Sequence, residues 1–189
     1  IRKLNEAMAR PCTIELDPVV RWRSRLVHVR RYPKGGKVGY DGTVVLKRDS
    51  FLGIVPVGYG DGYPIALSNK AVVRLCGKGG GGGNGEQQVR YAPVIGRVNM
   101  DQVIVDLTHP TSPANHSASQ VAQAQLDDIV ELVSSDADAP NSLVNLASQA
   151  GSTCYEMLCR VSHRVPRVWH DSAQSADPVA LPFRDHSAA

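Results

Sequence analysis

The feature that most constrains the fold is a succession of short, apolar, β-branched runs separated by glycine- and proline-rich breaks. In residues 19–31, apolar and polar side chains roughly alternate from Trp22 onward, which predicts a strand. Further strand-like runs cover residues 38–46, 51–57, 70–76, 89–107 (strand, turn, strand), 127–133 and 161–169. Many short strands with little helix predict a mainly β fold, a small β-barrel or sandwich-like domain.

One or two short helices complete this prediction. Residues 142–150 carry apolar side chains at helical spacing, and either Asn141 or Ser142 could cap the helix. Gly151 would end it, because glycine readily adopts the left-handed conformation at a helix C-terminus. A second short helix is predicted over residues 155–158.

Composition and charge exclude several classes of protein. The 189 residues are 42% hydrophobic and 21% charged, which is typical of one soluble globular domain. The formal net charge of +3 is too slight to predict a polyanion partner, and no apolar run is long enough to span a membrane. The four cysteines match neither a zinc site nor a disulfide framework, so we expect reduced thiols and no metal.

Four segments lack a clear strand or helix pattern. Residues 77–85 form a glycine tract that reads as a mobile hairpin tip, and residues 108–125 read as a long surface connection. Residues 1–18 form a lead-in and residues 172–189 a disordered tail, which leaves residues 19–171 as the β domain.

Five sequence blocks carry a family resemblance, and they occur in the family's order. They are residues 24–29 (SRLVHV), 37–43 (KVGYDGT), 56–64 (PVGYGDGYP), 96–102 (GRVNMDQ), and 155–159 (YEMLC) running into 164–167 (RVPR). A glycine-rich turn alone is weak evidence, whereas five ordered blocks are specific. The chain therefore resembles the C-terminal domain of alanine racemase, a fold-type III pyridoxal-phosphate enzyme.

The resemblance implies a larger enzyme. Members of the family have an N-terminal (β/α)8 barrel that carries the cofactor lysine, and no such pattern is visible in this chain. Residues 1–18 would then lead in from that barrel. The resemblance further implies pyridoxal 5'-phosphate as cofactor, a small amino acid as substrate, and a head-to-tail homodimer in which each C-terminal domain completes the partner's site. It implies a cytoplasmic enzyme that supplies D-alanine for peptidoglycan, and a chain that is inactive without the barrel.

Three residues match the family's central site positions. Tyr40 matches the catalytic base opposite the lysine; a free phenol has a pKa of about 10, so it needs cationic neighbours to act as a base. Met100 matches the residue whose backbone N–H binds the substrate carboxylate. Tyr155 matches the tyrosine that donates to the cofactor phosphate and narrows the substrate pocket.

Other matches line the entrance or support the site. These are Tyr59, Arg97, Asn99, Asp101 and Arg167. For Arg97 a plain surface ion pair is the alternative, and Asp101 would either fix its loop or pair with a barrel cation. Arg164 and Arg167 flank a proline in the last predicted strand, and both a structural and an entrance role are open.

The chain departs from the family pattern at three positions. Ile65 stands where arginine is common, which removes a cation from the entrance, and Asn99 stands where cysteine is common beside the pocket. Asp41 follows Tyr40 where glycine is usual, and a close, unpaired carboxylate would disfavour a phenolate. Asn99 therefore puts the preference among small amino acids in doubt.

Two alternatives stay open. A serine or broad-specificity racemase shares the fold, although a bulky ring at Tyr155 favours alanine. A non-catalytic β-barrel binding module is the other, because residues 22–31 interleave arginines with aromatic and apolar residues as some nucleic-acid binders do. A solvated strand face explains that pattern more simply, so we expect no nucleic-acid partner.

Overall fold

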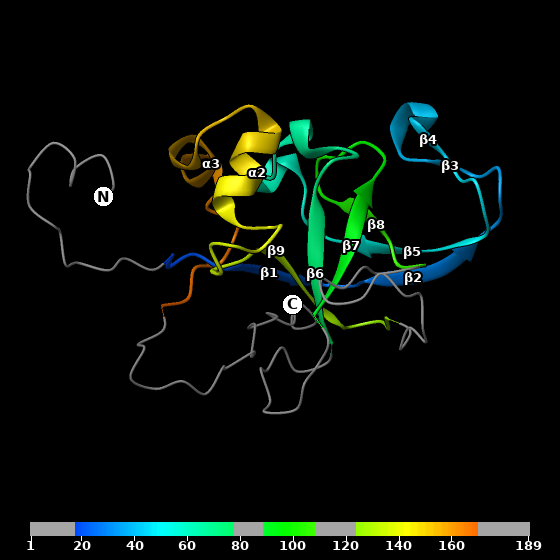
Figure 1. The fold of residues 1–189 in the computed structure, drawn as a ribbon, viewed down its shortest axis with the longest axis horizontal. Helices are drawn as coiled ribbons and strands as arrows, with labels where there is room; N and C mark the ends of the chain where they lie inside the picture. The colour runs from blue at the N-terminus through cyan, green and yellow to red at the C-terminus, as the bar shows by residue number, and fades with distance from the viewer. Residues whose placement is uncertain (1–17, 78–88, 109–123, 170–189) are drawn as a thin grey trace, which may run out of the picture.

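The computed structural model describes residues 18–77, 89–108 and 124–169. Its centre is a seven-stranded antiparallel sheet in the order β1-β9-β6-β7-β8-β5-β2 (Figure 1). The strands are β1 (Trp22–Arg25), β2 (His28–Tyr32), β5 (Ser50–Val55), β6 (Val72–Gly77), β7 (Arg90–Ile95), β8 (Val103–Asp106) and β9 (Ile129–Val133). A separate two-stranded ribbon pairs β3 (Lys37–Val38) with β4 (Val44–Val45).

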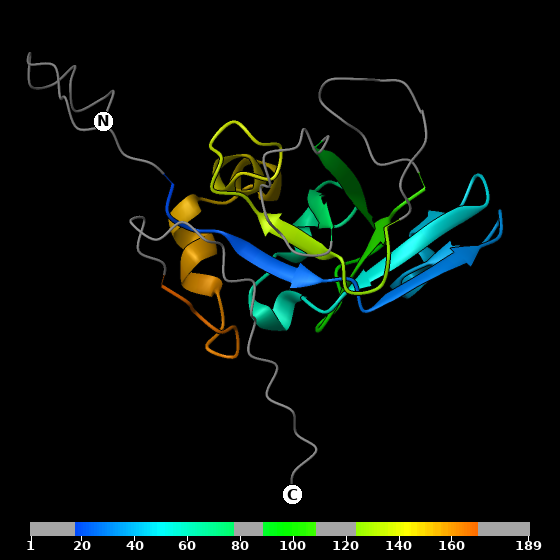
Figure 2. The same ribbon diagram turned by 90° about the horizontal axis from the view of Figure 1, so that it is seen from below.

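The two edges of this sheet are consecutive in the chain. The Leu26 N–H donates to the Asp128 carbonyl on the β9 side, and the Val27 N–H donates to the Ile54 carbonyl of β5. The chain therefore stops pairing on the β9 side at Leu26 and starts pairing with β5 at Val27. This change of partner curls the sheet into a half-barrel (Figures 1 and 2). This confirms the predicted mainly β, barrel-like fold class.

The change of partner also explains why the predicted alternation stops. Leu26 is fully buried, as the alternating pattern from Trp22 predicts, but His28 and Arg30 are exposed. In β2 it is Val29 that packs against the core. The face of the chain that points to the core therefore changes between β1 and β2. A single pattern of period two does not describe both strands.

The main hydrophobic core draws many of its buried side chains from the strands of the curled sheet. Tyr63 follows the 3-10 turn η2 (Tyr59–Asp61) and is fully buried. Its ring lies edge-on to the ring of Trp22, with a distance of 6.2 Å between the ring centroids. Burial raises the pKa of the Tyr63 phenol, so this tyrosine is a neutral core residue. A smaller cluster of Val38, Leu46 and Leu52 packs beneath the β3–β4 ribbon and fixes it to the sheet.

Two α-helices cover one end of the sheet, α2 (Leu143–Ala150) and α3 (Cys154–Arg160) (Figure 1). The Ser142 hydroxyl caps α2 by accepting from the Asn145 N–H, and Gly151 ends it at φ 64°. Both predicted helices are confirmed, and of the two candidate caps the structure uses Ser142. Helix α2 packs on α3 and on the 3-10 turn η3 (Ile65–Leu67).

Two strand predictions were wrong in whole or part. The run over residues 38–46 is interrupted by the 3-10 turn η1 (Tyr40–Gly42), because its glycines and Asp41 adopt positive φ. Residues 161–169 form no strand, since their carbonyl groups are used locally, for example by the Arg167 guanidinium at Val161. Proline at position 166 also removes a ladder donor there.

Several sequence predictions fall outside the described residues: most of the 1–18 lead-in, most of the 77–85 glycine tract, most of the 108–125 connection and the 172–189 tail. Strands β6 and β7, on either side of the glycine tract, do pair antiparallel. In the part of the chain that is described, Cys76, Cys154 and Cys159 are free thiols. Over the same residues, no helix is long and apolar enough to cross a membrane.

Candidate active site

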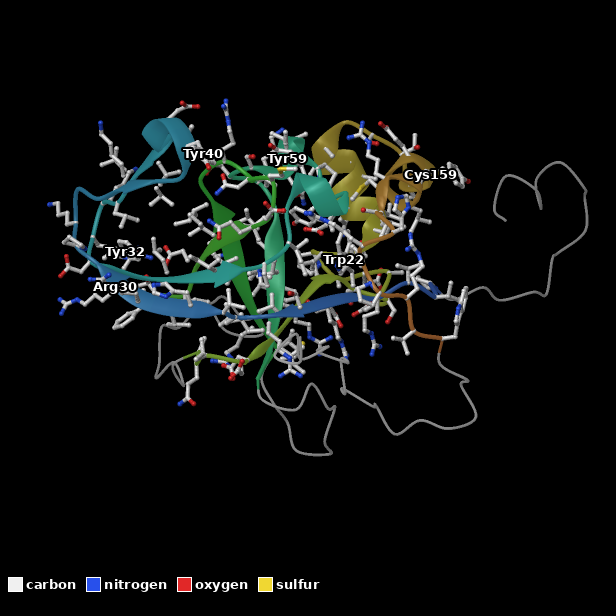
Figure 3. All side chains as sticks on the ribbon, turned by 180° about the vertical axis from the view of Figure 1, so that it is seen from behind. Trp22, Arg30, Tyr32, Tyr40, Tyr59 and Cys159 are labelled. Atoms are coloured by element: carbon white, nitrogen blue, oxygen red, sulfur yellow. The ribbon has the colours of Figure 1, made fainter. Side chains whose placement is uncertain are left out.

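Three turns lie at one edge of the half-barrel and carry most of the sequence-predicted site residues. We call them the Tyr40 turn (residues 39–43), the Tyr59 turn (residues 58–63) and the Met100 turn (residues 96–102). In Figure 3 the side chains of Tyr40 and Tyr59 are spread along the upper edge, with Cys159 of α3 further along it. Trp22 lies inside the molecule and Tyr32 on the strand below.

The Tyr40 turn holds its tyrosine out from the β3–β4 ribbon. The side chain of Tyr40 is 67% exposed, unlike the buried Val38 two residues earlier. Gly39 has φ 73°, and a Cβ atom there would lie 3.0 Å from the Arg97 backbone nitrogen. A side chain at position 39 would therefore push the Tyr40 turn away from the Met100 turn.

An ion pair ties the same two turns together. The Arg97 guanidinium donates to the Asp41 carboxylate at 2.8 Å, and both side chains are exposed. The carboxylate beside Tyr40 is thus paired with a guanidinium. The same contact occupies Arg97, a predicted entrance cation, with a partner from its own domain.

The Tyr59 turn and the Met100 turn are joined through their backbones. The Tyr59 N–H donates to the Asn99 carbonyl at 2.9 Å, and the Gly60 N–H donates to the Met100 carbonyl at 2.8 Å. A Cβ atom at Gly58 would collide with these same two carbonyl oxygens. Glycine at position 58 is therefore required for the close approach.

The Met100 turn leaves one amide available. The Met100 side chain is exposed, and among the described residues its backbone N–H has no hydrogen-bond partner. The neighbouring Asn99 N–H is used, since it donates to the Gln102 carbonyl at 3.0 Å. A backbone amide on an exposed turn without a partner in the described part of the chain can bind a carboxylate oxygen. The Asn99 Oδ1 atom is buried and, within the described residues, has no donor.

Tyr155 sits apart from the three turns. It lies in the first turn of α3, its side chain is 81% exposed, and within the described residues its hydroxyl has no hydrogen-bond partner. Next to it, hydrogen bonds from the Ser152 hydroxyl and Arg160 hold the pKa of Glu156 below its usual range. The structure brings Tyr40, Tyr59 and Met100 onto connected turns, and among the described residues no hydrogen bond joins Tyr155 to them.

Two further predicted residues have partners within the domain. Asp101 accepts from the Arg164 guanidinium at 2.7 Å. Arg167 donates to the Val161 carbonyl at 2.9 Å and to two other carbonyls that follow α3. Arg167 thus holds the segment that follows α3 through that segment's own carbonyl groups. This geometry agrees with the structural role that the sequence left open for it.

Sequence reasoning missed three residues that hold the turns, Ser68, Asn69 and Asp61, and left the role of a fourth, Arg164, open. The Asn69 Oδ1 accepts the Gly96 N–H at 2.6 Å, and the Ser68 hydroxyl accepts the Val98 N–H at 2.9 Å. Asp61 and Arg164 form an ion pair at 2.7 Å. Asp61 and Arg164 both lie inside the blocks shared with the family, which was the available signal. Ser68 and Asn69 lie outside those blocks.

Two hydrogen-bond donors of this domain fit one side of a site for a phosphate-bearing cofactor and an amino acid. The exposed Tyr155 phenol is a single hydrogen-bond donor suited to a phosphate oxygen, and the Met100 amide is suited to a carboxylate. Among the described residues, no group of three His, Cys, Asp or Glu side chains is placed to hold a metal ion.

Comparison with known proteins gives a consistent family. The family model described as "Alanine racemase, C-terminal domain" matches residues 19–169. Alanine racemase of Halothermothrix orenii is 34% identical over 154 residues, which cover 82% of this chain and 35% of the relative. Alanine racemase of Desulfovibrio desulfuricans is 36% identical over 159 residues, covering 84% of this chain and 36% of the relative.

Solved structures agree. The fold is similar to alanine racemase from Pseudomonas aeruginosa, with a TM-score of 0.62 and 30% identity, over 80% of this chain and 35% of that one. It is also similar to alanine racemase from Bartonella henselae with covalently bound pyridoxal phosphate, with a TM-score of 0.61 and 25% identity, over 79% of this chain and 34% of that one.

Fold and site together define a curled β domain that presents connected polar turns at one edge. The chain belongs to the alanine racemase C-terminal domain family. It spans about a third of the length of the curated relatives it matches.

Proposed function

We propose that this chain is the C-terminal domain of an alanine racemase and forms one side of its active site. The observation that carries the proposal is the pairing of two turns that present an exposed Tyr40 and a Met100 amide without a partner among the described residues, held together by the Arg97–Asp41 ion pair. The other side of the site comes from the N-terminal barrel domain. Pyridoxal 5'-phosphate, when bound, supplies the electron sink that makes the Cα proton of the amino acid acidic.

Tyr40 is the base on one face of the substrate. In racemisation a proton leaves Cα on one face and a proton is added on the other face. Two acid–base groups are therefore required, one on each face of the substrate. The Tyr40 phenol oxygen takes or returns that proton, and a lysine of the barrel domain serves the opposite face. The exposure of Tyr40 supports this role, because the hydroxyl is available to a partner domain.

Met100 and Tyr155 orient the bound molecules. The Met100 N–H donates to the substrate carboxylate, and this assignment is supported by its lack of a hydrogen-bond partner in the part of the chain that the structure describes. The Tyr155 hydroxyl donates to the cofactor phosphate, and its ring limits the room beyond a methyl side chain. Tyr59 and Arg97 line the entrance, where a cation attracts the carboxylate group of the amino acid.

The assembly and cellular role follow from the same proposal. The domain acts in a head-to-tail homodimer, in which it completes the site of the partner subunit's barrel. The protein is cytoplasmic and supplies D-alanine for peptidoglycan. The family assignment supports this assembly, and the exposed apolar side chains of Ile65 and Leu158 near the site edge are suited to burial against a second domain.

A serine or broader racemase is the second candidate, and Asn99 favours it. Its Oδ1 atom is buried without a donor among the described residues, directly before Met100 in the chain. A rotation of the Asn99 side chain that exposes this acceptor would let a substrate hydroxyl donate to it. Comparing serine with alanine in the intact enzyme, with and without Asn99→Cys, separates the two: alanine preference unchanged by the substitution would remove this candidate.

The test of the proposal is racemisation of L-alanine by the complete protein, compared with the chain of residues 1–189 alone. We expect activity in the complete protein with added pyridoxal 5'-phosphate and none in the chain alone. Racemisation by the chain alone would contradict this division of labour. Salt-dependent binding of single-stranded nucleic acid by an inactive complete protein would favour the binding-module alternative.

A further inference from the structure

Arg164 contacts two of the three turns at once. Its Nε atom donates to the Asp61 carboxylate at 2.7 Å, and its Nη2 atom donates to the Asp101 carboxylate at 2.7 Å. Asp61 belongs to the Tyr59 turn and Asp101 to the Met100 turn. A planar guanidinium can hold two carboxylates in fixed directions, which an ammonium group cannot do.

Asp61 links this contact to the backbone of the Tyr59 turn. Its second carboxylate oxygen accepts the Gly58 N–H at 2.8 Å, and its carbonyl accepts the Ser162 N–H at 2.9 Å. Asp61 is only 14% exposed, whereas Arg164 is 46% exposed. The segment after α3 is thus fastened to the Tyr59 turn by one backbone bond and one ion pair.

The Tyr59 turn in turn fixes the Met100 turn. Two N–H groups, of Tyr59 and Gly60, donate to the carbonyls of Asn99 and Met100. The Asn99 and Met100 carbonyls belong to the two peptide planes that meet at Met100, and the Met100 N–H lies in the same plane as the Asn99 carbonyl. Any rotation that keeps both bonds leaves the Met100 N–H pointing in one direction. Releasing Arg164 would free the two turns to separate.

We propose that Arg164 is a positioning residue of the site, which sets the direction of the Met100 backbone amide by clamping the Tyr59 turn against the Met100 turn. The inference rests on the proposed function for its effect on catalysis, but the clamp itself is a property of the domain. Arg164 touches neither substrate nor cofactor in this account. Hydrogen bonds to Asp101 and Asp61 also raise the pKa of Arg164, so the guanidinium stays charged at any working pH.

The first experiment measures the clamp without any activity. Amide hydrogen exchange at Tyr59 and Gly60 is compared in the chain of residues 1–189 and in its Arg164→Gln and Arg164→Lys variants. We expect exchange at both amides to be about tenfold faster in Arg164→Gln and intermediate in Arg164→Lys, with strand β6 unchanged. Arg160→Gln is the matched control, because Arg160 is similarly exposed and, in the described ranges, its ion pair is with Glu156 of the same helix.

The second experiment measures the consequence in the complete racemase. If the Met100 amide holds the substrate carboxylate equally before and during reaction, Arg164→Gln raises the KM for alanine by about tenfold and changes kcat by less than about threefold. Arg164→Lys recovers part of the loss, and Arg160→Gln has wild-type values.

The outcomes separate the two proposals. Unchanged exchange at both amides in Arg164→Gln would overturn the clamp, whatever the kinetics. A fall in kcat with an unchanged KM would overturn its role at the Met100 amide. If the wild-type complete protein does not racemise alanine, the proposed function fails, and the exchange result alone decides whether Arg164 clamps the turns.

Discussion

Asp41 adopts a backbone conformation that most residues avoid, at φ 63°, directly after the proposed base. Aspartate tolerates this left-handed region better than most residues, because its short side chain can interact locally. Here the carboxylate reaches Arg97 instead, so the departure from glycine at this position adds a charge pair rather than only strain. The pair lowers the positive potential at the proposed entrance.

Asp41→Asn tests that electrostatic effect. Asparagine keeps the left-handed backbone but leaves the Arg97 cation unpaired at the entrance. We expect the KM for alanine in the complete enzyme to fall about threefold at low ionic strength and the difference to vanish in about 0.5 M salt. Asp49→Asn is the control, because it breaks an exposed ion pair with Arg31 on another part of the domain. A change in KM that salt does not affect would contradict the electrostatic explanation.

Some residues of the candidate site could be predicted from the sequence, and others could not. Tyr40, Tyr59 and Met100 stand in blocks shared with the family, so the resemblance pointed to them. No local pattern could show that Asp61 and Asp101 share one arginine, because the pairs join residues 103 and 63 positions apart. Such contacts depend on how turns meet in space, which periodicity and propensity do not encode.

At the scale of elements, α2 was predictable in its extent and its ends. Apolar spacing, a serine before the first turn and a glycine after the last one are each local signals, and all three agree. The strand over residues 161–169 was wrong for the complementary reason. Among the described residues no strand pairs with this segment, and its carbonyl groups accept hydrogen bonds locally from Arg167.

Ser142→Ala tests the cap of α2. Removing the hydroxyl leaves the Asn145 N–H without its acceptor, so we expect the free energy of unfolding to fall by about 1 kcal/mol. Ser148→Ala is the matched control: it lies on the exposed face of the same helix, where alanine is the better helix former. Urea denaturation of the chain measures both, and equal effects of the two substitutions would contradict the assignment of Ser142 as the cap.

At the scale of the whole molecule, one half of the sheet closes around a buried carboxylate. Glu131 of β9 is 1% exposed and lies 3.2 Å from Arg23 of β1, with Arg21 at 3.4 Å and Arg74 of β6 at 3.7 Å. The registers agree, because Glu131 is the cross-strand partner of both Arg23 and Arg74. The carboxylate therefore joins the strand that switches partners to the middle of the sheet.

Glu131→Gln should be costly. The amide keeps the shape but leaves several guanidinium groups facing one another at a largely buried position. We expect a loss of about 2–3 kcal/mol in the free energy of unfolding, less than for a fully buried pair because the arginines are partly solvated. Asp49→Asn, which breaks an exposed pair, should change it by less than about 0.5 kcal/mol. Similar small losses for both variants would show that Glu131 does not organise this half of the sheet.

The sequence predicts a curled β domain, but it does not predict where the sheet closes. Short strands with glycine and proline breaks predict a curled β domain, but the crossing at Leu26 and Val27 depends on which strands lie alongside, a long-range property. The same closure places the turns of the candidate site at one edge. That edge is the surface on which the proposed barrel domain would have to dock.

The measurement that tests the central claim most directly is proton exchange at Cα of each alanine enantiomer by the complete enzyme carrying Tyr40→Phe. In deuterated water, we expect one enantiomer to lose exchange by at least about a hundredfold while the other still exchanges, because only one face loses its base. Tyr32→Phe, a strand tyrosine packed on the smaller cluster, should behave as wild type. Exchange of both enantiomers at wild-type rates in Tyr40→Phe would contradict the assignment of Tyr40 as the base.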